Sequence, residues 1–402
     1  MASEEACRTL CAANATCNSY TWTPGAKPKD DCHYTHNCWW RDDSVWDLKD
    51  THSCLGQSGY KGVPPVSPSP SPSSPGPGPA PAPIPPAPKD ALNVLFVIFD
   101  DLRIMHGAWG FHGQAHTPNT DAFANRSLIF DNAYCQQAVC GPSRASLISG
   151  RRPDSTQMWN FVGGFRQTPG AETWNTWPEW FRKRGYFTAG VGKLFHPGDP
   201  KDFDPQSWTG NKYSGYFGQD SCPKKSPNSH GCPVTDPKHV YPDVETLTIA
   251  KSLLGQAKNG SVPFWIGVGF VKPHMPHVFP AKYLDVVPAL ENIQLAAHPL
   301  PPSGGGGVQL DWTGGKGSDG PVGQDTDFMN PTDNATAADW RRSYYAAAAF
   351  SDDLFGELLA ELDRLQLSDN TIVIMTADHG WGLGTTESCF IVLLFFKWWW
   401  WW

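Results

Sequence analysis

The chain has 402 residues, of which 17% are charged, and a net charge of −8 at pH 7. This length allows two or three domains around one large core, and the acidic balance argues against nucleic acid as a partner, although a local cluster of cationic side chains can still bind a small anion. The 39 Gly and 38 Pro residues exclude a coiled coil or a basic tail and favour a loop-rich enzyme with a linker.

Residues 1–62 form a cysteine-rich segment that holds six of the eleven cysteines: Cys7, Cys11, Cys17, Cys32, Cys38 and Cys54. This density is typical of a disulfide scaffold, and the alternative of a zinc module is disfavoured because the segment has no CxxC pair. The cysteine spacing and the closing "SGYKG" resemble a PAN/Apple-like module, which implies a glycan or protein ligand. A disulfide-stapled cap without a ligand is the other interpretation.

The cysteines also indicate the compartment. Disulfides persist in oxidising surroundings, and four Asn-x-Ser/Thr sequons, at Asn14, Asn125, Asn259 and Asn334, agree with export. We therefore expect a protein of the secretory pathway, located outside the cell or in a lysosome- or vacuole-like compartment. The opening "MASEEACRTL" has no apolar signal core, so either the chain starts after processing or the gene model is incomplete.

Residues 63–88 alternate proline with small residues in "VPPVSPSPSPSSPGPGPAPAPIPPAP". This composition predicts an extended, polyproline-like spacer between two folded units. From residue 89 to 384 apolar runs alternate with amphipathic stretches, which predicts an α/β domain with a mainly parallel central sheet flanked by helices.

Four predicted strands of this domain end in polar residues: "NVLFVIFDD", "YFTAGVGKLFHPG", "VPFWIGVGFVKPHMPH" and "TIVIMTADHGW". The polar residues that follow are, in chain order, Asp100, Asp101, Lys193, His196, Lys272, His274, His277, Asp378 and His379. In an open α/β sheet the ligand site lies beyond the carboxyl ends of the strands, so we expect these groups to meet at one edge. The alternative for each pair is an ordinary strand end that contacts solvent or caps a helix.

The carboxylates and one imidazole in this set suit Ca²⁺ or Mg²⁺. Before the last strand, Phe350, Leu354, Leu358, Leu362 and Leu365 recur every three or four residues, which predicts a helix with one apolar face on the sheet. Its short exit, "LSDN", leads directly into the strand.

The segment "CQQAVCGPSRASLISGRRP" places Cys140, Pro142 and Arg144 in a Cys-x-Pro-x-Arg motif. Together with "FDDLR", "TPNTDAFANRSLIFDNAYCQQAVCGPSRASLISGRRPD", "GVGKLFHPG", "VKPHMPH" and "TADHGW", it resembles the sulfatase family from about Asn93 to Gly384. In that family the motif is the signal for oxidising the cysteine to formylglycine. The resemblance therefore implies a formylglycine at position 140 and a formylglycine-generating enzyme as a partner.

The resemblance also implies roles for the strand-end residues. One Ca²⁺ would be held by Asp100, Asp101, Asp378, His379 and the modified residue 140; Arg144 would stabilise the diol of the hydrated aldehyde, Lys193 and His274 would bind sulfate, and His196 would orient the second hydroxyl for release. One hydroxyl of the diol attacks sulfur, and deprotonation of the other expels sulfate and restores the aldehyde. Lys193 or His274 would be the general acid, and Lys272 and His277 are expected at the rim.

The substrate class implied is a sulfated carbohydrate, such as sulfated uronic acid or other sulfated polysaccharide units. Two hypotheses of other classes stay open. The chain could be a phosphate or phosphonate ester hydrolase of the wider alkaline phosphatase superfamily, or a non-catalytic secreted protein that binds glycans and keeps a sulfatase remnant. The Cys nucleophile position and the single-metal ligand set weigh against the phosphatase.

Cysteines 222 and 232 lie in a proline-rich loop, where we expect a structural disulfide between them, and Cys135 is expected to be a buried thiol. Residues 385–402 depart from the family pattern, in which a Glu-His-Gly segment and a further sulfate-binding lysine follow. The apolar run before Lys397 is too short for a bilayer span, and we interpret "TTESCFIVLLFFKWWWWW" as a sequence artefact. An enzyme that lacks the C-terminal part is expected to be weak or inactive.

Overall fold

The structure is a computed structural model that describes residues 84–110, 113–161, 163–198, 200, 203–222, 231–297 and 333–383, and the backbone of four short strands elsewhere. The chain divides into two compact units. In the first, β1 (Ser19–Trp22) pairs with both β2 (Cys38–Arg41) and β3 (Gln57–Tyr60) in an antiparallel sheet. The disulfides and ligand expected for residues 1–62, and most of the expected spacer, lie outside the described residues.

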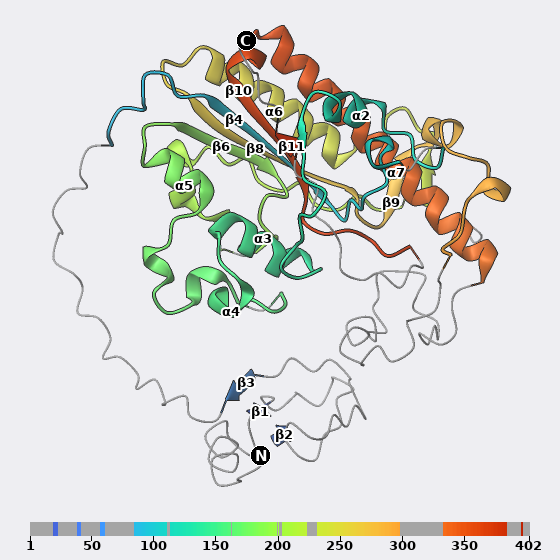
Figure 1. Ribbon diagram of the computed structural model, residues 1–402, viewed down its shortest axis with the longest axis horizontal. Helices are drawn as coiled ribbons and strands as arrows, with labels where there is room; N and C mark the ends of the chain where they lie inside the picture. The colour runs from blue at the N-terminus through green and yellow to red at the C-terminus, as the bar shows by residue number, and fades with distance from the viewer. Residues whose placement is uncertain are drawn as a thin grey trace. The chain divides into compact units, whose positions relative to one another are not determined.

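The second unit is built on a six-stranded sheet of order β5-β11-β10-β4-β8-β6 (Figure 1). Four strands run parallel: β4 (Asn93–Asp100), β6 (Phe187–Gly192), β8 (Phe264–Pro273) and β10 (Thr371–Ala377). The short strand β11 (Phe395–Phe396) pairs antiparallel with β10 and with β5 (Leu128–Ile129). The predicted α/β fold with a mainly parallel sheet is confirmed.

Strand β4 shows why its sequence is a continuous apolar run. Alternate side chains point to opposite faces of a strand: Leu95, Val97 and Phe99 join one core cluster, whereas Val94, Phe96 and Ile98 join the other. All eight residues of β4 are buried. A strand covered by helices on both faces has no polar side to present, as is usual for parallel sheets.

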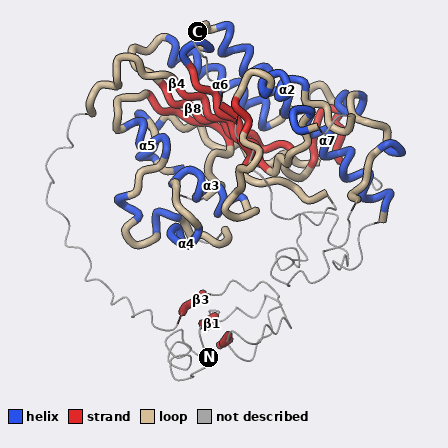
Figure 2. The backbone as a smooth tube through the Cα atoms, in the orientation of Figure 1, coloured by secondary structure: helices blue, strands red, loops and turns tan. Residues whose placement is uncertain are grey.

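Helices cover both faces of this sheet (Figure 2). One face carries α2 (Pro118–Ala124), α6 (Pro242–Lys258) and α7 (Asn334–Arg364), and the other carries α3 (Cys140–Ser149) and α5 (Trp177–Arg182). The remaining elements are α4 (Pro153–Thr156), the parallel pair β7 (Gly231–Val234) and β9 (His277–Pro280), and the 3-10 helices η1 (Gly107–Trp109), η2 (Phe165–Gln167), η3 (Ala171–Thr173), η5 (Pro205–Ser207), η6 (Thr209–Asn211), η7 (Ala281–Asp285), η8 (Leu290–Asn292) and η11 (Ser368–Asn370).

The predicted helix before the last strand is α7, which is much longer than its apolar spacing indicated. It has 31 residues and begins after Asp333, whose carboxylate accepts a hydrogen bond from the backbone of Thr336 at 2.9 Å. The N-terminal half escaped prediction because its buried residues are mostly small or polar, including a run of four alanines from Ala346 to Ala349, and show no clear apolar period. Leu365 lies at the C-cap rather than inside the helix.

The strand order puts a topological switch next to β4. Its two sheet neighbours are β8 and β10, and the chain reaches them through connections that lead to opposite sides of β4. Ligand sites of open α/β sheets form at such points, beyond the carboxyl ends of the strands. Among the described residues, no helix combines the length and the apolar character that a membrane crossing requires.

Candidate active site

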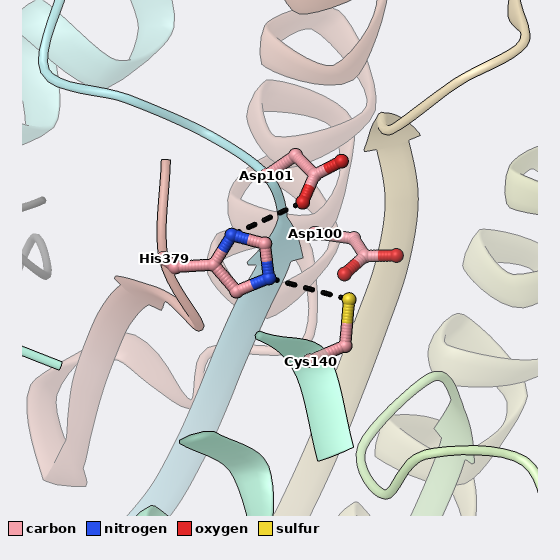
Figure 3. Close-up of side chains that lie close together, drawn as sticks. All are labelled: Asp100, Asp101, Cys140 and His379. Carbon is pink, nitrogen blue, oxygen red and sulfur yellow. Dashed lines mark hydrogen bonds and ion pairs between the residues drawn. The ribbon is translucent and has the colours of Figure 1, made fainter. Parts of the chain in front are cut away.

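Four potential metal ligands meet beyond the carboxyl ends of β4 and β10. Asp100 ends β4 and Asp101 follows it with a φ of 64°, His379 follows β10, and Cys140 is the first residue of α3. One donor atom from each of these four buried residues lies within 4.8 Å of all the others (Figure 3). Residues from three distant parts of the sequence thus form one cluster: the strand-end pattern predicted that Asp100, Asp101 and His379 would meet, and the family resemblance implied that Cys140 would join them.

Cys140 lies deep in this cluster. Its Sγ atom is 3.2 Å from Nε2 of His379 (Figure 3). Burial, reinforced by the carboxylate of Asp100, raises the pKa of the Cys140 thiol well above its ordinary value. Because the thiolate is the reactive form of cysteine, an unmodified Cys140 is a weak nucleophile in this position.

The surroundings of the Asp101 carboxylate indicate whether the cluster fits a metal ion. Both of its carboxylate oxygens are buried, and neither has a hydrogen-bond partner among the described residues. Its Oδ1 atom lies 3.2 Å from Nδ1 of His379. Burial raises the pKa of Asp101, and a buried carboxylate without a full set of hydrogen bonds is costly. A hard cation would satisfy these oxygens, so the residues present fit a divalent ion such as Ca²⁺.

The neighbouring Asp100 is compensated by two cations. Arg144 donates from Nη2 to Oδ1 of Asp100 at 3.1 Å, and Lys193 donates from Nζ to Oδ2. Burial alone would raise the pKa of Asp100, but Lys193, His274 and Arg144 hold it well below its usual range. Burial likewise opposes the charge of Lys193, yet Asp100 raises the pKa of this lysine above its ordinary value.

Asp378 lies beside the four-residue cluster. Its Oδ1 atom accepts hydrogen bonds from the backbone N–H groups of Asp101 and His379 at 3.0 and 2.9 Å, and its Oδ2 atom accepts from Nε of Arg144 at 2.9 Å. Oδ2 is also 3.6 Å from Nε2 of His379. The carboxylate therefore ties the two strand ends to α3, and its role as a metal ligand stays a prediction.

The other two predicted site histidines, His274 and His196, lie near the cluster and are half-buried. His274 places Nε2 3.9 Å from Oδ2 of Asp100 and 3.8 Å from Oδ2 of Asp101. His196 packs its ring against Phe161, with centroids 4.5 Å apart. Burial, aided by the positive charge of Lys193, lowers the pKa of His196 to about 4. At neutral pH this imidazole is uncharged and can accept a proton.

Two expectations for the end of β8 and the segment after it were wrong. Lys272 and His277 were expected at the rim, but they are 3% and 1% exposed. Lys272 donates from Nζ to the carbonyl oxygens of His274 at 3.1 Å and Pro276 at 2.7 Å. The His277 ring packs edge-on against Trp340, with centroids 5.4 Å apart. The chain turns back into the core at β9, which the sequence pattern did not indicate.

Other contacts of the site were missed at the sequence level. Ser143 stands at a variable position of the Cys-x-Pro-x-Arg motif, yet its hydroxyl donates to the carbonyl oxygen of Asp378. Asp243, in the first turn of α6, accepts from the backbone N–H groups of Val271 and Lys272 at 2.8 Å each. Such contacts with backbone atoms leave no residue-type signature, so only the folded arrangement could reveal them.

The predictions for the remaining cysteines met different outcomes. The expected disulfide between Cys222 and Cys232 is present, with Cα atoms 5.6 Å apart. Cys135 is half-buried, whereas a buried thiol was expected.

The part of the chain that contains this site is similar to known proteins. The sulfatase family matches the chain over residues 92–389. Human iduronate 2-sulfatase is 38% identical over 317 residues, which cover 73% of this chain and 56% of that protein. The chain belongs to the sulfatase family. A protein named sulfatase from Formosa agariphila is 29% identical over 320 residues, which cover 73% of this chain and 60% of that protein. This sulfatase chain thus spans little more than half the length of these relatives.

Solved structures agree with the sulfatase fold. A protein in complex with its substrate D-glucosamine-2-N,6-O-disulfate superposes with a TM-score of 0.56 at 20% identity, over 77% of this chain and 71% of that chain. The phosphonate monoester hydrolase of Agrobacterium radiobacter gives a TM-score of 0.51 at 19% identity, over 76% of this chain and 68% of that chain. At these identities the similarity establishes the fold alone.

Proposed function

We propose that this sulfatase hydrolyses sulfate esters of carbohydrates through a formylglycine made from Cys140. The observation that carries the proposal is the position of Cys140: it opens a buried helix and lies among the potential metal ligands Asp100, Asp101 and His379. Conversion exchanges the thiol for an aldehyde, which removes the need for a buried thiolate. A formylglycine-generating enzyme is the partner that this step requires.

We further propose that Asp100, Asp101, His379 and the modified residue 140 hold one Ca²⁺, with Asp378 as an additional ligand. The support is the pair of buried Asp101 oxygens, which accept no hydrogen bond from the described residues and have only imidazoles nearby, together with the oxygen-rich donor set. When bound, the ion would polarise the sulfate oxygens and favour an ionised hydroxyl at residue 140. Arg144, buried between Asp100 and Asp378, holds these carboxylates in place.

The remaining site residues are proposed to bind sulfate and to assist proton transfer. The hydrated formylglycine supplies one hydroxyl to receive the sulfuryl group and a second whose deprotonation releases sulfate. Lys193 and His274, which border Asp100, would bind the sulfate oxygens, and one of them would protonate the departing alcohol oxygen. His196, which is neutral because burial lowers its pKa to about 4, would orient the second hydroxyl for release.

The substrate class and the cellular compartment are proposed in general terms. The similarity to proteins named iduronate 2-sulfatase supports sulfated uronic acid or related polysaccharide units as substrates. The cysteine-rich residues 1–62 and the sequons support the secretory pathway, either outside the cell or in a lysosome-like compartment. We propose that residues 1–62 are a separate binding module, that 63–88 are a spacer, and that 89–384 are the catalytic domain.

The test is a pair of activity assays on protein made with a formylglycine-generating enzyme. We expect hydrolysis of a chromogenic sulfate ester to exceed that of the matching phosphate ester, and Cys140→Ala to abolish it, because the nucleophile is lost. Faster phosphate hydrolysis would favour the phosphate or phosphonate esterase instead. Absence of both activities, with glycan binding retained, would favour the non-catalytic alternative.

A further inference from the structure

A shallow hollow lies on the surface beside the segment that leads into Cys140. Its volume is about 440 Å³, and it is lined by Gln136, Gln137, Arg152, Pro153, Asp154 and Trp159. Its walls thus come from the bent segment that leads into α3, from the start of α4, and from the loop after α4. The catalytic chemistry proposed above uses none of these residues.

The hollow is close to the catalytic cluster. Gln137 precedes Cys140 by three residues, a distance that an extended chain covers in at most about 11 Å. Its side-chain Nε2 donates to the carbonyl oxygen of Trp159 at 2.7 Å and so fixes the loop against this approach. In the same loop, Phe161 lies so near α3 that a Cβ atom on Gly141 would be 3.3 Å from its ring. Phe161 also packs on His196, so the loop connects the hollow to the site.

The side chains around the hollow have the chemistry that recognises a sugar ring. Trp159 is 51% exposed, although an indole of this size is usually well covered. A pyranose has an apolar C–H face that can lie on such a ring and a polar edge of hydroxyls. The amides of Gln136 and Gln137 and the carboxylate of Asp154 can hydrogen-bond these hydroxyls, and Arg152 can pair with a sulfate or carboxylate group.

We propose that this hollow is a subsite for a second saccharide unit, adjacent to the unit whose sulfate ester reaches residue 140. The inference rests on the proposed function and narrows its substrate class: the preferred substrate is a sulfated oligosaccharide or polysaccharide, not an isolated sulfated monosaccharide. Trp159 supplies the stacking surface, and Arg152 selects chains that carry further anionic groups.

Binding measured by isothermal titration tests this subsite without turnover. In the Cys140→Ala background, a sulfated tetrasaccharide should bind more tightly than the sulfated monosaccharide of its terminal unit. Adding Trp159→Ala should weaken tetrasaccharide binding about tenfold, the scale of one lost aromatic contact, and reduce the preference for the longer ligand. Gln136→Ala should have a smaller effect in the same direction, and because the Gln136 side chain is exposed, this substitution should leave the fold intact.

The matched control is Trp180→Ala. Trp180 is a similarly exposed indole, 43% accessible, on α5, where the guanidinium of Arg184 lies 3.6 Å above its ring. Its loss should leave tetrasaccharide binding unchanged. Equal effects of the two tryptophan variants, or equal affinity of the parent for both ligands, including no detectable binding of either, would overturn the subsite. Sulfate ester hydrolysis by the chain with Cys140 intact is measured separately, so that a failed subsite and a failed proposed function give different results.

Discussion

Asp100 and Asp101 are adjacent in the chain, yet their surroundings differ in one decisive respect. Asp100 is neutralised by Arg144 and Lys193, whereas the buried Asp101 has no Arg or Lys partner among the described residues and only the imidazoles of His379 and His274 nearby. A cation therefore contributes most at Asp101. We expect purified protein to contain about one Ca²⁺ per chain, and Asp101→Asn to lose it, because the substitution removes one of few anionic ligands.

Elemental analysis of the two proteins measures this directly. Asp369→Asn is the control, since Asp369 is exposed in the turn after α7, and it should keep the metal content of the parent. Retention of calcium by Asp101→Asn would contradict the ligand assignment. Two zinc ions per chain would instead favour the phosphatase-like alternative.

Whether a site residue could be predicted from the sequence depended on the kind of contact that it makes. Asp100, Asp101 and His379 were found from sequence because strand ends of a parallel sheet must meet at one edge. His277 was misplaced because its burial depends on the turn into β9, and Ser143 was overlooked because it bonds to a backbone carbonyl. Residue type and spacing indicate which residues follow a strand, but they do not indicate where the chain turns into the core or which side chains bond to backbone atoms.

Between elements, the closest approach near the site is that of β8 to the residues after β6. A Cβ atom on Gly269 would lie 2.2 Å from the backbone of Lys193, whose N–H donates to the Gly269 oxygen at 2.8 Å. Gly269→Ala must displace the segment that carries Lys193. We expect it to lower the free energy of unfolding by about 2 kcal/mol or more, measured by denaturant titration.

A second glycine substitution controls for this prediction. Gly255 lies in α6, and nothing is within 4 Å of a Cβ atom built there. Because alanine is the better helix former, Gly255→Ala should raise the free energy of unfolding by up to about 1 kcal/mol. If both substitutions changed stability in the same direction and by similar amounts, the close packing of β6 on β8 would be refuted.

The segment between β4 and α2 contributes a pH dependence. Burial lowers the pKa of His106 to about 3 from an ordinary value near 6.5. Below about pH 6.5 the unfolded chain therefore binds a proton at His106 that the folded chain does not bind. The contribution of this residue to the free energy of unfolding is lost as the pH falls below about 6.5. The expected loss between pH 7 and pH 5 is about 2 kcal/mol.

Denaturant titrations at the two pH values test this dependence. His106→Gln should remove most of the pH-dependent loss, whatever it does to stability at pH 7. Replacing the exposed His116 by glutamine serves as the control and should keep the loss. An unchanged loss in His106→Gln would show that other groups cause it.

The elements themselves were predictable to different degrees. The four parallel strands were found from their apolar runs, because each is covered on both faces. The N-terminal half of α7 was not found, because alanines such as Ala346 and polar residues such as Ser343 are buried there by close packing rather than by an apolar period. The pairing of Phe395–Phe396 with β10 was not expected of a segment interpreted as an artefact.

The whole molecule combines a sulfatase family domain with a cysteine-rich segment. The domain's sheet brings strand ends and the start of α3 to one place, and every proposed step takes place there. The chain covers 56% of human iduronate 2-sulfatase, so the activity of the whole protein is a proposal that depends on this site. The proposed mechanism requires above all that residue 140 is not a cysteine in the mature enzyme.

Mass spectrometry of the tryptic peptide Ser127–Arg144, from protein made with a formylglycine-generating enzyme, tests this requirement most directly. The account predicts that residue 140 has lost the elements of hydrogen sulfide and gained one oxygen, and that the resulting aldehyde reacts with a hydrazide probe. Protein made without the generating enzyme should keep the thiol. If the peptide carried only unmodified Cys140 in the presence of that enzyme, the proposed sulfatase mechanism would be contradicted.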